Sequence, residues 1–141
     1  MDKKQFTFER VMMIDDNAVD RYVALYVMKK YAFAREVLEF DMATDALSYL
    51  QHNQNVADRL PQIILLDINM PAMNGFEFLE KLSEMPLCIK QSCCIIMLST
   101  SLNPDDHKRA HESPVVKQFL NKPLQQEDLA VISKFYVEAL N

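Results

Sequence analysis

Residues 63–75 read Ile-Ile-Leu-Leu-Asp-Ile-Asn-Met-Pro-Ala-Met-Asn-Gly, and this stretch decides the fold. The apolar run at 63–66 has no polar alternation, which is typical of a strand that helices cover on both faces. It ends in Asp67, and the loop that follows contains the turn-forming residues Pro71 and Gly75. Open α/β folds place their sites at the carboxyl edge of the sheet, so Asp67 is a candidate functional residue.

Three more apolar runs end in polar residues that suit a functional site. Residues 11–14 are followed by Asp15 and Asp16, residues 94–98 by Ser99, Thr100 and Ser101, and residues 115–120 by Asn121, Lys122 and Pro123. With Asp67, these strand ends supply three carboxylates, a hydroxyl and an ammonium group. Such a set can hold a divalent cation and a phosphoryl group.

Helical patterns separate the apolar runs, so strand and helix alternate about five times along the chain. The expected strands are 11–14, 37–40, 63–67, 93–98 and 115–120, and the expected helices are 17–30, 44–52, 75–84, 104–112 and 126–140. The first helix has Val19, Tyr22, Val23, Tyr26 and Val27 on one face, and residues 51–61 form a longer surface loop. This order predicts an α/β fold with a doubly wound, five-stranded parallel sheet.

Composition narrows the class of protein. The 141 residues, half of them hydrophobic, predict one domain with a substantial core. The net charge of −5 argues against a general nucleic-acid binder. No apolar run approaches the length of a membrane span, and the N-terminus lacks a signal peptide. Cys88, Cys93 and Cys94 offer no disulfide framework, so we interpret them as reduced core thiols of a cytoplasmic protein.

The chain contains a single glycine, Gly75. A glycine-rich phosphate-binding loop of either nucleotide-binding type is therefore excluded, which argues against an ATPase, a GTPase or a dinucleotide-dependent enzyme. A lone glycine in a turn supplies either a positive φ angle or a close approach of the backbone.

These residues, in this order, resemble a response-regulator receiver domain, the phosphoacceptor module of two-component signalling. The motifs that carry the resemblance are Asp15-Asp16, Asp67 with Asn69-Met70-Pro71 and Gly75, Met97-Leu98-Ser99, and Lys122-Pro123. The resemblance covers about residues 10–140 and implies a flavodoxin-like (βα)5 fold with strand order 2-1-3-4-5. We expect residues 1–141 to be a single receiver domain with no output domain, similar to stand-alone, chemotaxis-type regulators.

The resemblance also implies a chemistry. Asp67 is the phosphoacceptor and receives its phosphoryl group from a sensor histidine kinase or a phosphotransfer protein. Mg²⁺ is the cofactor, and its ligands are Asp15, Asp16, Asp67 and the backbone carbonyl of Asn69, with Asp15 often acting through water. Clustered carboxylates repel one another, which independently favours a cation there. Such a domain is not an enzyme for other substrates, since it catalyses only its own phosphorylation and dephosphorylation.

Five residues are expected to contact the phosphoryl group, respond to it or tune its lifetime. The Ser99 hydroxyl and the Lys122 ammonium contact its oxygens, and the peptide bond before Pro123 resembles the one that fixes this lysine in the family. Ser99 and Phe119 form the switch, although phenylalanine lacks the hydroxyl of the tyrosine often found there. Asn69 and Ser101 flank the path of an attacking water, so they are expected to tune the phosphoryl lifetime.

The resemblance places the output surface on the fourth helix, fifth strand and fifth helix. Candidate contact residues there are Asp105, Lys108, Arg109, Lys117, Gln118, Glu127, Lys134 and Glu138. This face is expected to bind an unknown downstream protein, and it is also a candidate dimer interface. The alternative explanation of these charges is solvation alone.

Two other functions remain open. A Mg²⁺-dependent phosphatase with an aspartyl-phosphate intermediate also has an acid after a strand, but it needs a second acid where this chain has Asn69. A phosphorylation-independent docking module would be expected to lack a site residue, and none is missing. His107 and His111 lie one helical turn apart, but without the glutamate of zinc proteases they are better explained as a solvated helix face than as a metal site.

Overall fold

A five-stranded parallel sheet forms the centre of the molecule, with strand order β2-β1-β3-β4-β5. The computed structural model describes residues 5–140, so residues 1–4 and 141 of the expected domain lie outside the described residues. The strands are β1 (Phe8–Ile14), β2 (Ala34–Phe40), β3 (Ile63–Leu66), β4 (Cys94–Ser99) and β5 (Val116–Asn121). The predicted doubly wound sheet and its strand order are confirmed.

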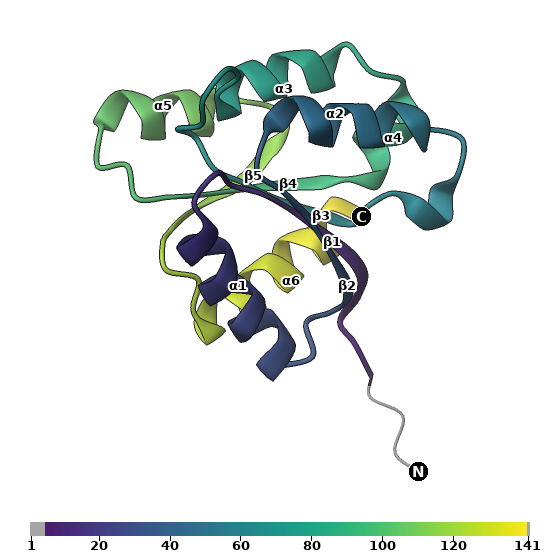
Figure 1. The fold of residues 1–141 in the computed structure, drawn as a ribbon, viewed down its shortest axis with the longest axis vertical. Helices are drawn as coiled ribbons and strands as arrows, with labels where there is room; N and C mark the ends of the chain where they lie inside the picture. Colours follow the sequence, from purple (N-terminus) through teal and green to yellow (C-terminus); the bar gives the residue numbers. More distant parts are fainter. Residues whose placement is uncertain (1–4, 141) are drawn as a thin grey trace.

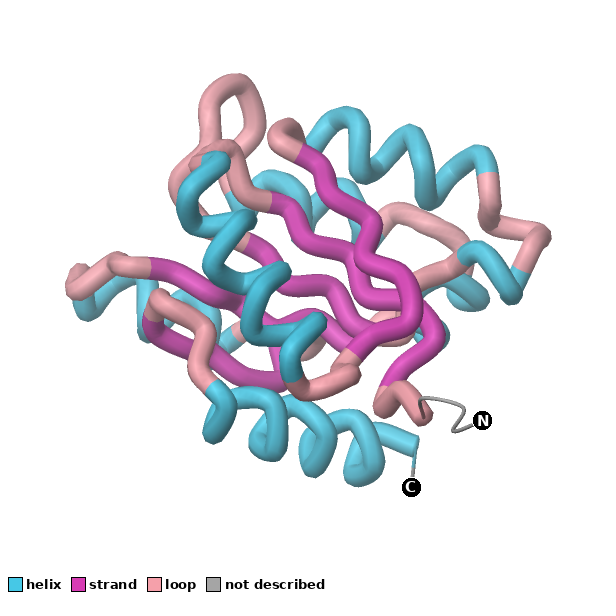
Figure 2. The backbone as a smooth tube through the Cα atoms, turned by 60° about the horizontal axis from the view of Figure 1, so that its bottom comes forward, coloured by secondary structure: helices cyan, strands magenta, loops and turns pink. Residues whose placement is uncertain are grey.

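Helices cover both faces of the sheet (Figures 1 and 2). In Figure 1, α1 (Ala18–Lys30) and α6 (Gln126–Leu140) lie below the sheet. The helices above it are α2 (Ala43–His52), α3 (Gly75–Ser83), α4 (Leu87–Ser92) and α5 (Pro104–Glu112). The short helix α4 was not predicted, nor was a 3₁₀ turn, Ala57–Arg59, inside the loop expected at 51–61.

Each face of the sheet has its own hydrophobic core. Ile95 and Met97 of β4 pack into one cluster, and Cys94, Ile96 and Leu98 pack into the other. This alternation explains why the strand sequence is apolar throughout, because both faces are covered.

The three cysteines differ in environment. Cys93 and Cys94 are buried in opposite clusters, and burial raises the pKa of both thiols above the ordinary range. The predicted core position is thus confirmed for these two residues. It is wrong for Cys88, which is exposed on α4.

The apolar stripe predicted on the first helix is only partly buried, since Val27 packs against the core but three other members are exposed. α1 packs on the sheet through Ala24 and Met28, each 1% exposed, whereas Val19, Tyr22 and Tyr26 are 69%, 72% and 59% exposed. Small and unbranched side chains let the helix approach the sheet closely. The bulkier residues, three and four positions apart, therefore form an exposed stripe instead.

Strand register brings the ends of β1, β3, β4 and β5 together. Ile14 pairs with Leu66, so the next residues, Asp15 and Asp67, emerge side by side. Ser99 pairs with Asn121, which directly precedes Lys122. The carboxyl edge therefore collects the polar residues that the sequence placed after each apolar run.

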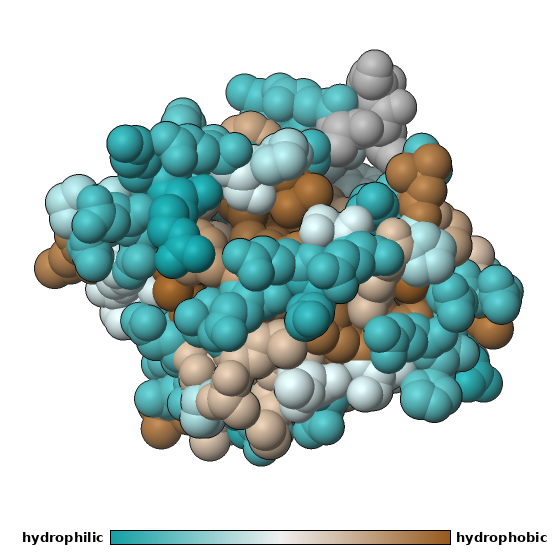
Figure 3. Space-filling view, turned by 90° about the horizontal axis from the view of Figure 1, so that it is seen from above, coloured by the Kyte–Doolittle hydropathy of each residue, from teal (hydrophilic) through white to brown (hydrophobic). Residues whose placement is uncertain are grey.

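The outer surface of the upper helical layer is mainly polar. Figure 3 views this layer from above, and hydrophilic side chains dominate it, with apolar atoms visible in the hollows between them. Among the described residues, no helix combines the length and the apolar character that a membrane span needs.

Candidate functional site

Three carboxylates form an acidic cluster at the carboxyl edge of the sheet. One oxygen from each of Asp15, Asp16 and Asp67 lies within 4.8 Å of the other two. Asp15 and Asp67 are buried, at 1% and 7% exposure, whereas Asp16 is exposed. Buried like charges at this spacing are unfavourable unless a cation neutralises them, and a set of oxygen donors suits Mg²⁺. The described side chains therefore fit the predicted metal site.

The backbone fixes the position of Asp67 from two sides. Its amide donates a hydrogen bond to the Ile14 carbonyl over 3.0 Å, and its Oδ1 accepts one from the Ile68 amide over 2.9 Å. Behind it, the Gly75 amide donates to the Ile68 carbonyl over 2.7 Å. These bonds hold the Asp67 carboxylate at the end of β3.

Gly75 allows α3 to begin directly against the Asp67 backbone. A Cβ atom at position 75 would lie 2.5 Å from the Asp67 carbonyl oxygen and 3.0 Å from the Ile68 Cα. Gly75 has no positive φ angle, so the chain uses its lone glycine for close approach rather than for an unusual conformation. Asn74 caps α3 through a capping box with Glu77, which fixes where the helix starts.

Burial dominates the electrostatics of Asp67. It raises the pKa of the Asp67 carboxyl to about 6, an effect that Lys122 opposes and Asp15 reinforces. The carboxylate is thus less stable than an exposed one, because nothing in its surroundings fully replaces lost hydration. A cation bound to the cluster would favour the ionised form.

Lys122 places its ammonium group among three carboxylates. Its Nζ lies 2.6 Å from Asp15 Oδ2, 2.9 Å from Asp20 Oδ2 and 3.5 Å from Asp67 Oδ1. Burial by itself lowers the pKa of Lys122, but the hydrogen bonds to Asp15 and Asp20 and the nearby Asp67 outweigh it, so the net pKa is raised. The peptide bond between Lys122 and Pro123 is cis.

Sequence reasoning did not single out Asp20. It stands in the first turn of α1, where an acid has an ordinary role beside the helix dipole. Its partner Lys122 comes 102 positions later, so no local spacing could reveal the contact.

The Ser99 hydroxyl is linked to the backbone of Ser101. Ser99 is 1% exposed, and its Oγ accepts a hydrogen bond from the Ser101 amide over 3.1 Å. The Ser101 hydroxyl donates to Asp106 Oδ2 over 2.6 Å, so it is turned toward α5. Asn69, the other predicted lifetime residue, is exposed two positions after Asp67.

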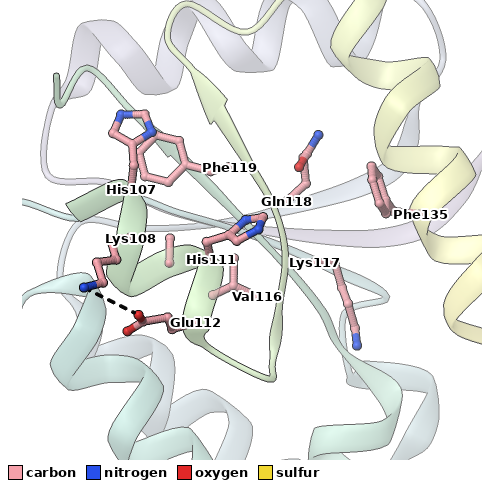
Figure 4. A pocket seen from close by; sticks show the side chains of 10 residues that line it. His107, Lys108, His111, Glu112, Val116, Lys117, Gln118, Phe119 and Phe135 are labelled. Atoms are coloured by element: carbon pink, nitrogen blue, oxygen red, sulfur yellow. Dashed lines mark ion pairs between the residues drawn. The ribbon is translucent and has the colours of Figure 1, made fainter. Parts of the chain in front are cut away.

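Phe119, the predicted switch residue, is half-buried and stacks on His107. Their ring centroids are 4.1 Å apart, and the rings are inclined by 33° (Figure 4). His107 Nε2 also lies 2.9 Å from the Ser101 carbonyl oxygen. The prediction of a solvated helix face therefore holds for the exposed His111 but is wrong for His107, which connects the loop after Ser99 to Phe119.

A groove of about 690 Å³ lies beside this stack, between α5, β5 and α6. Figure 4 shows Phe119 and Phe135 on its opposite sides, with His111 between α5 and β5. Lys108, Lys117 and Gln118, all predicted output residues, also line it. The structure thus brings part of the predicted output surface together around one groove.

The raised pKa of Asp67 predicts a pH-dependent stability. In the metal-free protein, native Asp67 binds a proton more readily than the unfolded chain does, so its contribution to the free energy of unfolding falls as pH rises from about 4 to about 6. The shift corresponds to a loss on the order of 2–3 kcal/mol. Urea unfolding with a chelator present, compared between the parent and Asp67→Asn, isolates this contribution. A difference that does not change over this pH range would contradict the assigned cause.

Comparison with known proteins connects this geometry to a family. Residues 11–134 match the model of the response regulator receiver domain. The two-component response regulator ORR5 of Oryza sativa subsp. japonica is 30% identical over 85% of this chain and 82% of its own length. The hybrid signal transduction histidine kinase C of Dictyostelium discoideum is 26% identical over 94% of this chain, which covers 10% of that kinase.

Solved structures share the fold. A two-component response regulator from Cytophaga hutchinsonii superimposes with a TM-score of 0.81, at 26% identity over 94% of this chain and 97% of its own. The Mn²⁺-bound form of response regulator Rcp1 has a TM-score of 0.68 at 25% identity, covering 89% of each chain. The phosphorylated cyanobacterial phytochrome response regulator RcpA has a TM-score of 0.69 at 26% identity, covering 90% of this chain and 89% of its own.

Proposed function

This chain belongs to the response regulator receiver domain family, and we propose that it takes a phosphoryl group onto Asp67 and relays the signal through contacts with other proteins. The observation that carries this proposal is the environment of Asp67, which lies between two other carboxylates and the Lys122 ammonium. The phosphodonor is a phosphohistidine in a sensor histidine kinase or a phosphotransfer protein. The relation to a hybrid histidine kinase supports such a donor.

The transfer is a nucleophilic displacement at phosphorus. One carboxylate oxygen of Asp67 attacks, the bond between phosphorus and the donor imidazole nitrogen breaks, and an acyl phosphate forms on Asp67. The leaving imidazole nitrogen takes up a proton. Positioning and charge stabilisation supply most of the catalysis in such a reaction. The Lys122 ammonium, 3.5 Å from Asp67 Oδ1, and the Ser99 hydroxyl at the end of β4 would contact the phosphoryl oxygens.

A divalent cation belongs to the proposal. Asp15, Asp16 and Asp67 would hold Mg²⁺ with their carboxylates, and Asn69 with its backbone carbonyl. When bound, the cation neutralises charge on the transferring phosphoryl group. The Mn²⁺-bound form of the related Rcp1 supports a divalent metal.

Mass spectrometry separates the candidate functions. The protein is incubated with Mg²⁺ and a small phosphodonor, and its intact mass is followed. We expect the addition of one phosphoryl group per chain. Rapid turnover of many phosphate esters would favour the aspartyl-phosphate phosphatase, and an unchanged mass would favour a phosphorylation-independent docking module.

Replacing Asp16 with alanine is expected to weaken Mg²⁺ binding and to slow phosphorylation. Asp16 is the exposed member of the acidic cluster, so its removal takes away a metal ligand with little loss of packing. Removing one of three clustered acids also reduces their repulsion, so the metal-free protein should be as stable as the parent or more stable. Isothermal titration with Mg²⁺ checks the first point, and an unchanged titration curve would contradict the role of Asp16.

The phosphoryl lifetime is expected to be minutes or shorter, because small uncharged residues flank the path of an attacking water. The Ser101 hydroxyl is turned toward Asp106, so it neither blocks nor repels that water. Ser101→Tyr should narrow the path and slow phosphate loss. Release of phosphate after donor removal measures this, and an hours-long lifetime in the parent, or no slowing in the variant, would contradict the argument.

The signal leaves through α5, β5 and α6. Phosphorylation moves Ser99 and Phe119, and the stack of Phe119 on His107 carries that movement to the groove lined by Lys108, Lys117 and Gln118. This surface binds the downstream protein and is also the candidate dimer interface. The free cysteines among the described residues agree with a cytoplasmic location for these contacts.

A further inference from the structure

Lys122 has an anionic partner that its proposed role does not require. Its Nζ lies 2.6 Å from Asp15 Oδ2 and 2.9 Å from Asp20 Oδ2, but 3.5 Å from Asp67 Oδ1. The ammonium group is therefore closer to α1 than to the acceptor. A phosphoryl group on Asp67 would offer Lys122 new oxygens, and Asp20 would still compete for the same three N–H donors.

The fold fixes Asp20 in this position. Asn17 caps α1, and its side chain accepts a hydrogen bond from the Asp20 amide over 3.0 Å. The Asp20 side chain is 32% exposed, and within residues 5–140 its carboxylate makes one ion pair, the one with Lys122. Within the described residues, the Asp20 carboxylate thus has Lys122 as its one charged partner. The Asp15 carboxylate, by contrast, also accepts a hydrogen bond from the Asn17 amide.

The pair of Asp20 and Lys122 lies beside free space on the α1 side of the site. A small cavity of about 140 Å³ adjoins the pair and is lined by Asp20, Leu98, Thr100 and Lys122. Lys122 itself is only 7% exposed, so water screens its contact with Asp20 poorly. A competing charge at 2.9 Å in such a place has a measurable effect on phosphoryl binding.

We propose that Asp20 is a positioning residue that holds Lys122 away from the acceptor and competes with the phosphoryl group for its ammonium. This inference rests on the proposed function. In the unmodified protein, Asp20 keeps Lys122 on the α1 side of the site, while Asp15 binds the same ammonium group at the end of β1. In the phosphorylated protein, it draws the lysine back and so weakens the hold on the phosphoryl group.

A double-mutant cycle with beryllofluoride tests the competition. Beryllofluoride with Mg²⁺ binds a carboxylate as a non-covalent stand-in for a phosphoryl group, and its dissociation constant is measured by ¹⁹F NMR in the parent, Asp20→Asn, Lys122→Ala and the double variant. We expect Asp20→Asn to bind about three- to tenfold more tightly than the parent, the gain typical of the net contribution of one hydrogen bond. In the Lys122→Ala background, the same substitution should change the affinity less than about twofold.

Asp45→Asn is the matched control. Asp45 is the third residue of α2, as Asp20 is the third residue of α1, and it is exposed. Asp45→Asn removes the same formal charge and the same kind of helix-dipole interaction as Asp20→Asn does. The beryllofluoride affinity of the Asp45→Asn variant should therefore equal that of the parent. Asp20→Glu, which restores the charge, should reverse part of the gain seen in Asp20→Asn.

The outcomes distinguish this inference from the proposed function. An equal gain from Asp20→Asn with and without Lys122 would mean general charge repulsion and would overturn the competition. An affinity in Asp20→Asn equal to or weaker than the parent's would overturn it as well. A parent protein that binds no beryllofluoride would contradict the proposed function and the inference together.

Discussion

Phosphoryl incorporation is expected to fall to background when Asp67 is replaced with asparagine. The amide keeps the size of the carboxyl group and can still accept the hydrogen bond from the Ile68 amide, but it lacks the anionic oxygen that attacks phosphorus. Incubation with Mg²⁺ and a small phosphodonor, followed by intact-mass measurement, checks this. Full labelling of Asp67→Asn would show that the acceptor lies elsewhere.

The loss of labelling should not reflect unfolding. Burial raises the pKa of the Asp67 carboxyl to about 6, so at neutral pH the parent protein contains a buried carboxylate that Asp67→Asn removes. The metal-free variant should therefore be at least as stable as the parent at neutral pH. Urea unfolding of the same sample provides the control. A variant much less stable than the parent would mean that the carboxylate has a structural role.

Replacing Gly75 with alanine is expected to have the largest effect on stability. The added methyl group would lie 2.5 Å from the Asp67 carbonyl oxygen, and backbone rather than a flexible side chain must move. Such overpacking costs about 1–3 kcal/mol, which exceeds what alanine gains in helix propensity. Because the displaced backbone carries the acceptor, the rate of phosphorylation should also fall by roughly tenfold to a hundredfold.

A second substitution in the same loop provides the contrast. Ala72 is exposed and has a φ of 68°, a left-handed conformation that glycine adopts without strain. Ala72→Gly should therefore leave the free energy of unfolding unchanged or raise it by up to about 1 kcal/mol. The relief of backbone strain is partly offset, because glycine adds conformational freedom to the unfolded chain. Equal losses of stability at the two positions would contradict the steric argument for Gly75.

The sequence predicted the fold because its strong signals are local. Each central strand contains a continuous apolar run, and a polar site residue follows at its carboxyl end. The same stretch of sequence therefore indicates both the strand and the end of it that faces the site. β1 and β2 extend three residues further toward the N-terminus than predicted, since pairing of Phe8 with Ala34 continues beyond the apolar run. The outer strand β2 mixes exposed and partly buried residues and has one buried residue, Ala34, which gives a weaker signal than β3 does.

Tertiary contacts account for the elements and faces that were predicted incorrectly or not at all. Helix α4 has six residues, too few for a periodic pattern. On α1, the stripe of large apolar residues matched a helical period, but the sheet accepts Ala24 and Met28 instead. The role of Asp20 depends on Lys122, 102 positions away, and that of His107 on its stacking with Phe119 of the next strand, so sequence spacing does not encode either role.

Lys122 lies far along the sequence from the acidic residues that it contacts, and this distance affects how the chain folds. Asp20 and Lys122 are 102 positions apart, and β3 and β4 lie between β1 and β5 in the sheet. Contacts between such distant segments require most of the intervening chain to be ordered first. A chain that has assembled only β1 to β3 brings the acidic residues together without the lysine that neutralises them. The finished site is thus formed at the end of assembly, and a nascent or truncated chain that lacks β5 should not be able to accept a phosphoryl group.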